Sequence, residues 1–108
     1  MNETKLKGLM GLCVRAGQAV FGEDSCMKAV REGKTALLLT DGGIAENAGA
    51  KYRALCEKNG VLSAVLPEGF LEEATGKPGK AMAVRSGGFA EQMIRCLEIS
   101  GQPENTDQ

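Results

Sequence analysis

The chain contains no histidine, and its four cysteines stand far apart in the sequence. Without histidine it lacks the side chain that most often moves protons near neutral pH and that commonly binds zinc. The cysteines form no C-x-x-C pair, and each falls at an apolar position of an expected helix, at residues 13, 26, 56 and 96. We therefore expect buried, reduced thiols and neither a metal site nor a cofactor.

The sequence also lacks the motifs of a catalytic centre. No serine or cysteine has a recognisable general base, and Gly76-Lys77 is followed by Pro78 rather than by the serine or threonine of a phosphate-binding P-loop. Glu72 and Glu73 are adjacent on an expected short helix, so their carboxylates point in different directions. We expect a protein that is not an enzyme.

Long apolar runs are missing as well. No run approaches the roughly 20 residues that span a bilayer, and residues 1–5 are too polar and acidic for a secretory signal. With 108 residues, 43% apolar and 25% charged, the composition is typical of one globular domain. We expect a cytoplasmic domain over residues 1–100, no membrane contact, and a polar, disordered tail over residues 101–108.

The charge is balanced overall but uneven along the chain. The net charge is −1 and the isoelectric point is about 5.5, whereas a general nucleic-acid binder is usually basic. Residues 1–60 hold nine basic and seven acidic residues, and residues 61–108 hold four and seven. Any surface that binds an anion is therefore expected mainly in the first 60 residues.

Apolar periodicity and glycines predict alternating helices and strands. The first helix carries an apolar stripe from Leu6 to Val14, and the run 36–40 has the length of a strand buried on both faces. Further strands are expected at 19–21, 61–66 and 81–85, with helices at 23–32, 45–59, 70–75 and 89–97. This order predicts an α/β fold, a three-layer α/β/α sandwich around a mixed four-stranded sheet.

The segment 22–33 is the leading candidate for a binding site. It reads as a glycine turn that opens a helix, with Lys28 one turn inside it. A helix start presents N–H groups that have no intrahelical partner, and these can hold a phosphate or contact a base edge. Glu23 and Asp24 in the first turn suit the helix dipole but repel a phosphate. Alternatively, Lys28 has no binding role and only forms surface ion pairs with Asp24 or Glu32, which lie four residues before and after it.

The order of elements and several local strings together resemble the ribosomal L-seven-Ae/L-thirty-e superfamily, and within it the small bacterial YlxQ-like proteins. The resemblance covers nearly the whole chain up to residue 99. Its matching strings are residues 9–17, 22–33, 34–41, 46–61 and 71–77, with Phe89 after a glycine at the start of the last helix. It implies a three-layer α/β/α fold and binding to RNA kink-turns, which are sharply bent duplexes with sheared G·A pairs.

The resemblance also implies where RNA would be contacted. Members that bind RNA carry Gly-x-Asn-Glu-x-x-Lys at a helix start, and here Gly22 and Lys28 match while Asp24 and Ser25 replace the asparagine and glutamate. An ionised aspartate only accepts hydrogen bonds, so Asp24 lacks the amide donor. A second contact surface corresponds to residues 74–78. The implied RNA-binding residues are Gly22, Asp24, Ser25, Lys28, Gly76 and Lys77.

Two functions follow from these features. The first is a monomeric, non-enzymatic protein that binds structured RNA, either ribosomal RNA or another RNA with a kink-turn, with ribosomal proteins as possible neighbours. The alternative is a protein-interaction or scaffold module that kept the fold and lost its RNA affinity, which the acidic residues 61–108 favour. A basic patch that joins Lys28, Lys34 and Lys77 on one side would favour RNA.

Overall fold

Helices and strands alternate along the chain in the predicted order. The computed structural model describes residues 1–99. Its helices and strands are α1 (Glu3–Arg15), β1 (Ala19–Phe21), α2 (Glu23–Arg31), β2 (Thr35–Asp41), α3 (Glu46–Asn59), β3 (Leu62–Leu66), α4 (Phe70–Thr75), β4 (Ala81–Arg85) and α5 (Gly88–Ile99). The expected tail, residues 101–108, lies outside the described residues.

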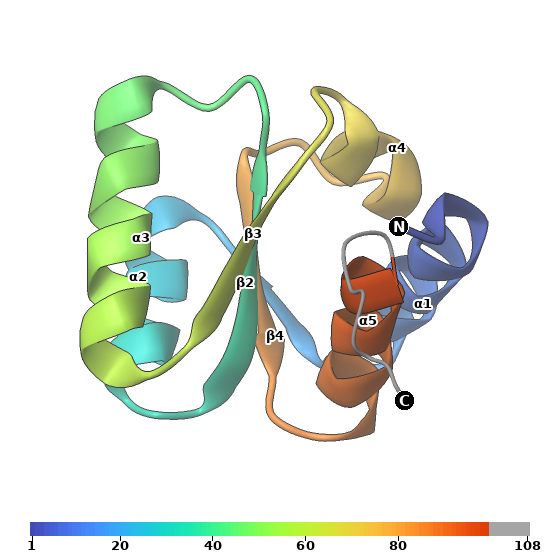
Figure 1. The fold of residues 1–108 in the computed structure, drawn as a ribbon, viewed down its shortest axis with the longest axis horizontal. Coiled ribbons are helices and arrows are strands. Elements are labelled where there is room, and N and C mark those ends of the chain that lie inside the picture. Colours follow the sequence, from blue (N-terminus) through green and yellow to red (C-terminus); the bar gives the residue numbers. More distant parts are fainter. Residues whose placement is uncertain (100–108) are drawn as a thin grey trace.

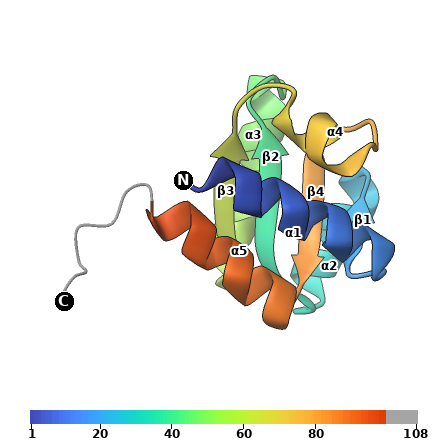
Figure 2. The same cartoon turned by 90° about the vertical axis from the view of Figure 1, so that its right-hand side faces the viewer.

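The strands form one mixed sheet in the order β1-β4-β2-β3. β2 and β3 are parallel and are connected through α3, whereas β4 runs antiparallel to both β1 and β2. Helices α2 and α3 cover one face of this sheet, and α1, α4 and α5 cover the other (Figure 1). Figure 2 shows α1 and α5 side by side across the second face. The predicted α/β fold with a mixed four-stranded sheet is confirmed.

Alternation of side chains along the two central strands gives each face its own core. Leu37 and Leu39 pack among α1, α4 and α5, whereas Leu38 packs against α2 and α3. In β4, Met82 faces the first group of helices and Ala83 faces the second. The continuous apolar run of β2 is therefore buried on both faces, as predicted.

The prediction that residues 61–66 form a buried strand is wrong. β3 is an edge strand that pairs only with β2, and Leu62 and Val65 are 54% and 60% exposed. Its apolar sequence resembles that of a central strand because periodicity reports apolarity and not the position of a strand within the sheet. Leu66, at the end of the strand, is buried.

All four cysteines are buried free thiols, as predicted. Burial raises the pKa of Cys13 to about 11. Burial also raises the pKa of Cys26 to about 11, although a backbone hydrogen bond at Ala83 opposes the rise. The thiolate forms of Cys13 and Cys26 are therefore scarce at neutral pH, which makes these two side chains small core residues rather than nucleophiles. Within residues 1–99, no helix is both long and apolar enough to cross a membrane.

We predict a large difference between two identical substitutions in neighbouring strands. Leu39→Ala, in the fully buried centre of β2, is expected to lower the free energy of unfolding by about 3–4 kcal/mol, because it leaves a cavity. Leu62→Ala, on the exposed edge, is the matched control and is expected to lower it by less than about 1 kcal/mol. Urea unfolding followed by circular dichroism measures both, and equal losses would contradict this assignment of core and edge.

Candidate nucleic-acid interface

Gly22 connects β1 to α2 and is the N-cap of that helix. Its backbone has φ 94° and ψ 143°, a conformation that L side chains rarely adopt, so glycine is required at this position. Its carbonyl accepts the first hydrogen bond of the helix from the N–H of Cys26, at 2.9 Å. No side chain caps the helix, so the N–H groups of the first turn remain available at its start.

A cleft of about 350 Å³ adjoins this helix start. Gly22 and Glu23 line one side, the beginning of α3 with Tyr52 lines another, and residues 78–81 close it. Burial, together with the nearby Cys26, Glu23 and Asp24, raises the pKa of Tyr52 to about 12, so its hydroxyl stays protonated. The structure thus places Gly22 beside the segment that directly follows Lys77.

Ser25 and Lys28 lie on a different side of α2. They line a second cleft, of about 220 Å³, together with Lys34 and Arg85. Lys28 pairs with Glu32 at 4.0 Å, rather than with Asp24, and Lys34 pairs with the same carboxylate at 3.5 Å. Two cations of the expected basic patch therefore share one acidic partner.

The remaining predicted residues border neither of these clefts. Asp24 is exposed in the first turn of α2. Gly76 ends α4 in the left-handed conformation, with φ 72°, and Lys77 is exposed after it, its N–H donating to Thr75 Oγ1 at 3.1 Å. The six predicted residues therefore spread over the start and side of α2 and over the turn after α4. Neither of the two clefts joins Lys77 to Lys28 and Lys34.

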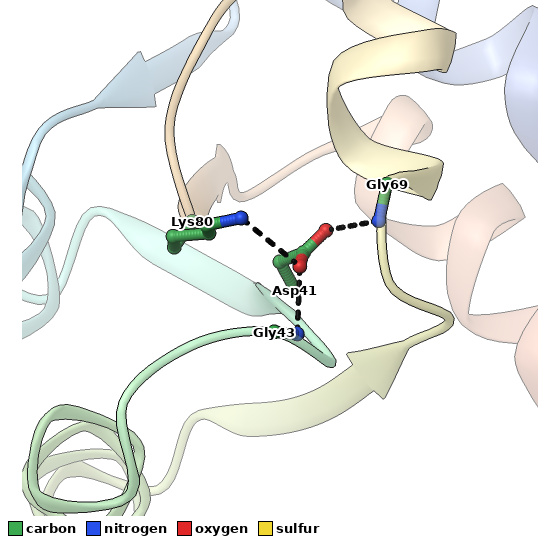
Figure 3. A network of polar contacts seen from close by, with 4 residues as sticks. All are labelled: Asp41, Gly43, Gly69 and Lys80. Atoms are coloured by element: carbon green, nitrogen blue, oxygen red, sulfur yellow. Dashed lines mark hydrogen bonds and ion pairs between the residues drawn. The ribbon is translucent and has the colours of Figure 1, made fainter.

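Asp41, the last residue of β2, organises this end of the sheet (Figure 3). Its buried carboxylate accepts hydrogen bonds from the N–H groups of Gly43 at 2.7 Å and Gly69 at 2.8 Å. Lys80 Nζ lies 3.6 Å from Asp41 Oδ2, and the carbonyl of Lys80 accepts from the N–H of Asp41 at 2.8 Å. One side chain thus connects the end of β2, the start of α4 and the segment before β4.

The Asp41 carboxylate stays charged although it is buried. Burial by itself would raise its pKa above the ordinary value of 3.8, but the hydrogen bonds from Gly43 and Gly69 and the charge of Lys80 outweigh burial and lower the pKa. The neighbouring glycine leaves room for this arrangement, because a side-chain carbon at Gly42 would lie 2.8 Å from the carbonyl oxygen of Leu66. The sequence signal that could have indicated this role is an aspartate that follows the apolar run 36–40 and precedes Gly42 and Gly43.

The fold and the surface at the start of α2 together describe the class to which the protein belongs. It is a small α/β/α protein with an uncapped helix start beside a turn that carries exposed lysine. Within residues 1–99, no cluster of three or more His, Cys, Asp or Glu side chains could hold a metal ion.

Comparison with known proteins shows which proteins this chain resembles. No protein-family model matches it. It is 27% identical over 101 residues to RNA-binding protein YlxQ of Enterococcus faecium, covering 90% of this chain and 95% of that protein. Its fold resembles a Bacillus halodurans protein of unknown function, with a TM-score of 0.82, 25% identity, and coverage of 87% of this chain and 97% of that one.

A second solved structure shares the fold at greater sequence distance. The Giardia lamblia 15.5kD RNA binding protein superposes with a TM-score of 0.71 at 16% identity, covering 89% of this chain and 87% of that chain. The resemblance to YlxQ-like proteins expected from the sequence is confirmed. The Enterococcus faecium protein and the Giardia lamblia protein are both named as RNA-binding proteins.

We predict that Asp41→Asn destabilises the protein by about 2–4 kcal/mol at neutral pH, because an amide cannot replace a carboxylate that accepts two N–H bonds beside a lysine. The carboxylate's contribution is fully present well above its unfolded pKa and is lost as the pH falls through the lower folded pKa. The gap between wild type and Asp41→Asn should therefore narrow below about pH 4.

Urea unfolding over a pH series measures this gap. Glu57→Gln, which changes an exposed carboxylate on α3, is the control and should change stability by less than about 0.5 kcal/mol. A gap for Asp41→Asn that stays constant from neutral to acid pH would contradict the role assigned to its charge.

Proposed function

We propose that this protein binds structured RNA and that the start of α2 is the part that meets the RNA. The observation that carries the proposal is the conformation of Gly22, which presents the free N–H groups of an uncapped helix beside residues 78–81. Similarity over 90% of the chain to a protein named RNA-binding supports it. The RNA would be ribosomal RNA or another folded RNA.

The type of RNA follows from the shape of the duplex. The major groove of A-form RNA is too deep and narrow for protein groups to contact base edges. A helix start can reach guanine edges only where the duplex is sharply bent and its groove is open. A kink-turn provides that opening, and we propose it as the preferred target.

Each residue of the surface has a distinct proposed part. The N–H groups of the first turn of α2 donate to a phosphate or to guanine O6. Asp24 accepts from guanine imino or amino groups, and Ser25 lies next to it as a short polar side chain. Lys28 contacts a phosphate, and Lys77, presented by the turn at Gly76, contacts the backbone from the second side. Glu23 and Asp24 make the helix start acidic, so affinity is expected to be modest.

We predict micromolar or tighter binding of a labelled kink-turn RNA at low salt, measured by fluorescence anisotropy. Lys28→Gln should weaken binding about three- to tenfold and lower the dependence of log Kd on log salt by about one, because one phosphate contact is lost. Arg95→Gln is the matched control, since it removes an exposed cation from α5 on the opposite face of the sheet.

A straight duplex of the same composition tests the shape requirement. Equal affinity for the straight and the bent RNA would contradict kink-turn recognition, although general RNA binding would stand. No binding of any folded RNA at low salt, or an unchanged Kd in both Lys28→Gln and Lys28→Glu, would overturn the proposed function.

A second prediction is a gain of affinity. Asp24→Asn restores the amide donor at the position implied by the resemblance and removes one negative charge, so it should tighten kink-turn binding about tenfold. Glu23→Gln removes a charge from the neighbouring exposed position without restoring that donor, and should tighten binding less. Equal gains in the two variants would show that only charge matters and would contradict base contact by residue 24.

The edge of the sheet supports the second candidate function. β3 exposes Leu62 and Val65 beside an unpaired strand edge, a surface that can add a strand from a protein partner. Under this alternative, purification from a cell extract retains a partner after ribonuclease treatment, and Val65→Lys releases it. Under RNA binding, ribonuclease removes the partners and Val65→Lys changes nothing.

A further inference from the structure

The second cleft contains more polar groups than the proposed function uses. We call it the Thr35 cleft; its side chains come from Val20, Ser25, Lys28, Ala29, Glu32, Lys34, Thr35 and Arg85. It lies between the side of α2 and the ends of β2 and β4 that are far from Asp41. The neighbouring elements β1, α2 and β2 therefore meet there with the end of β4, which is distant in the sequence.

Thr35 carries an unusual feature at this position. The residue is 5% exposed, and its Oγ1 is the only buried side-chain nitrogen or oxygen in the described part of the chain that has no hydrogen-bond partner. By contrast, the hydroxyls of Thr40 and Thr75 donate to backbone carbonyls at 3.4 and 2.8 Å. A buried hydroxyl without a partner costs about 1–3 kcal/mol, so its presence next to a cleft points to an acceptor that arrives with a ligand.

The charges around the cleft indicate the sign of that ligand. Lys28, Lys34 and Arg85 contribute three positive charges, and Glu32 contributes one negative charge. Glu32 already pairs with both lysines, at 4.0 and 3.5 Å. No carboxylate among residues 1–97, whose side chains the structure describes, pairs with Arg85. The formal balance is positive, in contrast to the acidic first turn of α2.

A phosphate group suits this donor set. It has several acceptor oxygens for the hydroxyls of Ser25 and Thr35, and a planar guanidinium such as that of Arg85 can bind two of its oxygens at once. Lys28 and Lys34 can turn from Glu32 to the phosphate at little cost, because exposed ion pairs contribute only about 0–1 kcal/mol. Glu32 therefore competes with the ligand for the two lysines.

We propose that the Thr35 cleft binds a backbone phosphate of the same RNA that meets the start of α2, an inference that rests on the proposed function. Ser25 and Lys28 belong to the helix that begins at Gly22, and Lys28 lies about 9 Å along its axis from that start. An RNA strand that leaves the helix start along α2 reaches Lys28, Lys34 and Arg85 in turn. The positive charge of the proposed RNA interface therefore lies in the Thr35 cleft, whereas the start of α2 is acidic.

The test measures RNA affinity over a salt series for three variants of the cleft. Arg85→Gln should weaken binding about three- to tenfold and lower the salt slope by about one. Thr35→Val keeps the shape of the side chain and should weaken binding about threefold while leaving the melting temperature equal or higher, because an unpaired buried hydroxyl is removed. Glu32→Gln should tighten binding about threefold, because it frees Lys28 and Lys34.

The outcomes separate the two proposals. If wild-type protein binds RNA and Arg85→Gln and Thr35→Val both behave like the control Arg95→Gln, the cleft proposal is overturned and the proposed function stands. If wild-type protein binds no folded RNA, both are overturned. Inorganic phosphate and adenosine monophosphate distinguish the source: binding of either as tightly as RNA would show a small-molecule phosphate site and overturn the RNA assignment.

Discussion

The buried carboxylate of Asp41 holds together the end of the sheet where the helix start lies. Its two oxygens accept hydrogen bonds from the N–H groups of Gly43 and Gly69, which precede and follow β3 in the sequence. Lys80, in the segment before β4, contacts the same carboxylate. A buried charge is tolerated here because every contact favours its ionised form. Since residues 78–81 also line the cleft at Gly22, the position of that cleft depends on the contacts of Asp41, which does not itself line the cleft.

The two clefts along α2 differ in chemistry although one helix borders both. The cleft at its start offers backbone N–H groups under an acidic first turn, which suits recognition of a distorted base pair more than attraction of RNA. The Thr35 cleft offers cations and hydroxyls, which suits attraction and positioning. Because the cations gather in the Thr35 cleft, the net charge of −1 for the whole chain does not conflict with the proposed binding of RNA.

Most of the fold could be predicted from the sequence, because glycines mark the turns and apolar stripes mark the helices. The exposed position of β3 could not, since an edge strand and a central strand can share the same apolar residues and differ only in their neighbours. Gly22 and Lys28 were recognisable as a helix start with one cation. That Lys28 and Thr35 lie together with Arg85 could not be predicted, because Arg85 lies at least fifty residues from both in the sequence. It joins them only through the antiparallel pairing of β4 with β2.

The position of β1 in the sheet has a consequence for the order in which the chain assembles during synthesis. β2, α3 and β3 form a continuous unit over residues 35–66, whereas β1 pairs only with β4, through Ala19↔Val84 and its neighbours. The first strand must therefore wait until β4 has been made, and such distant contacts form slowly. Because residues 78–81 and Arg85 complete the two clefts, a nascent chain lacks both surfaces until it has been extended through β4.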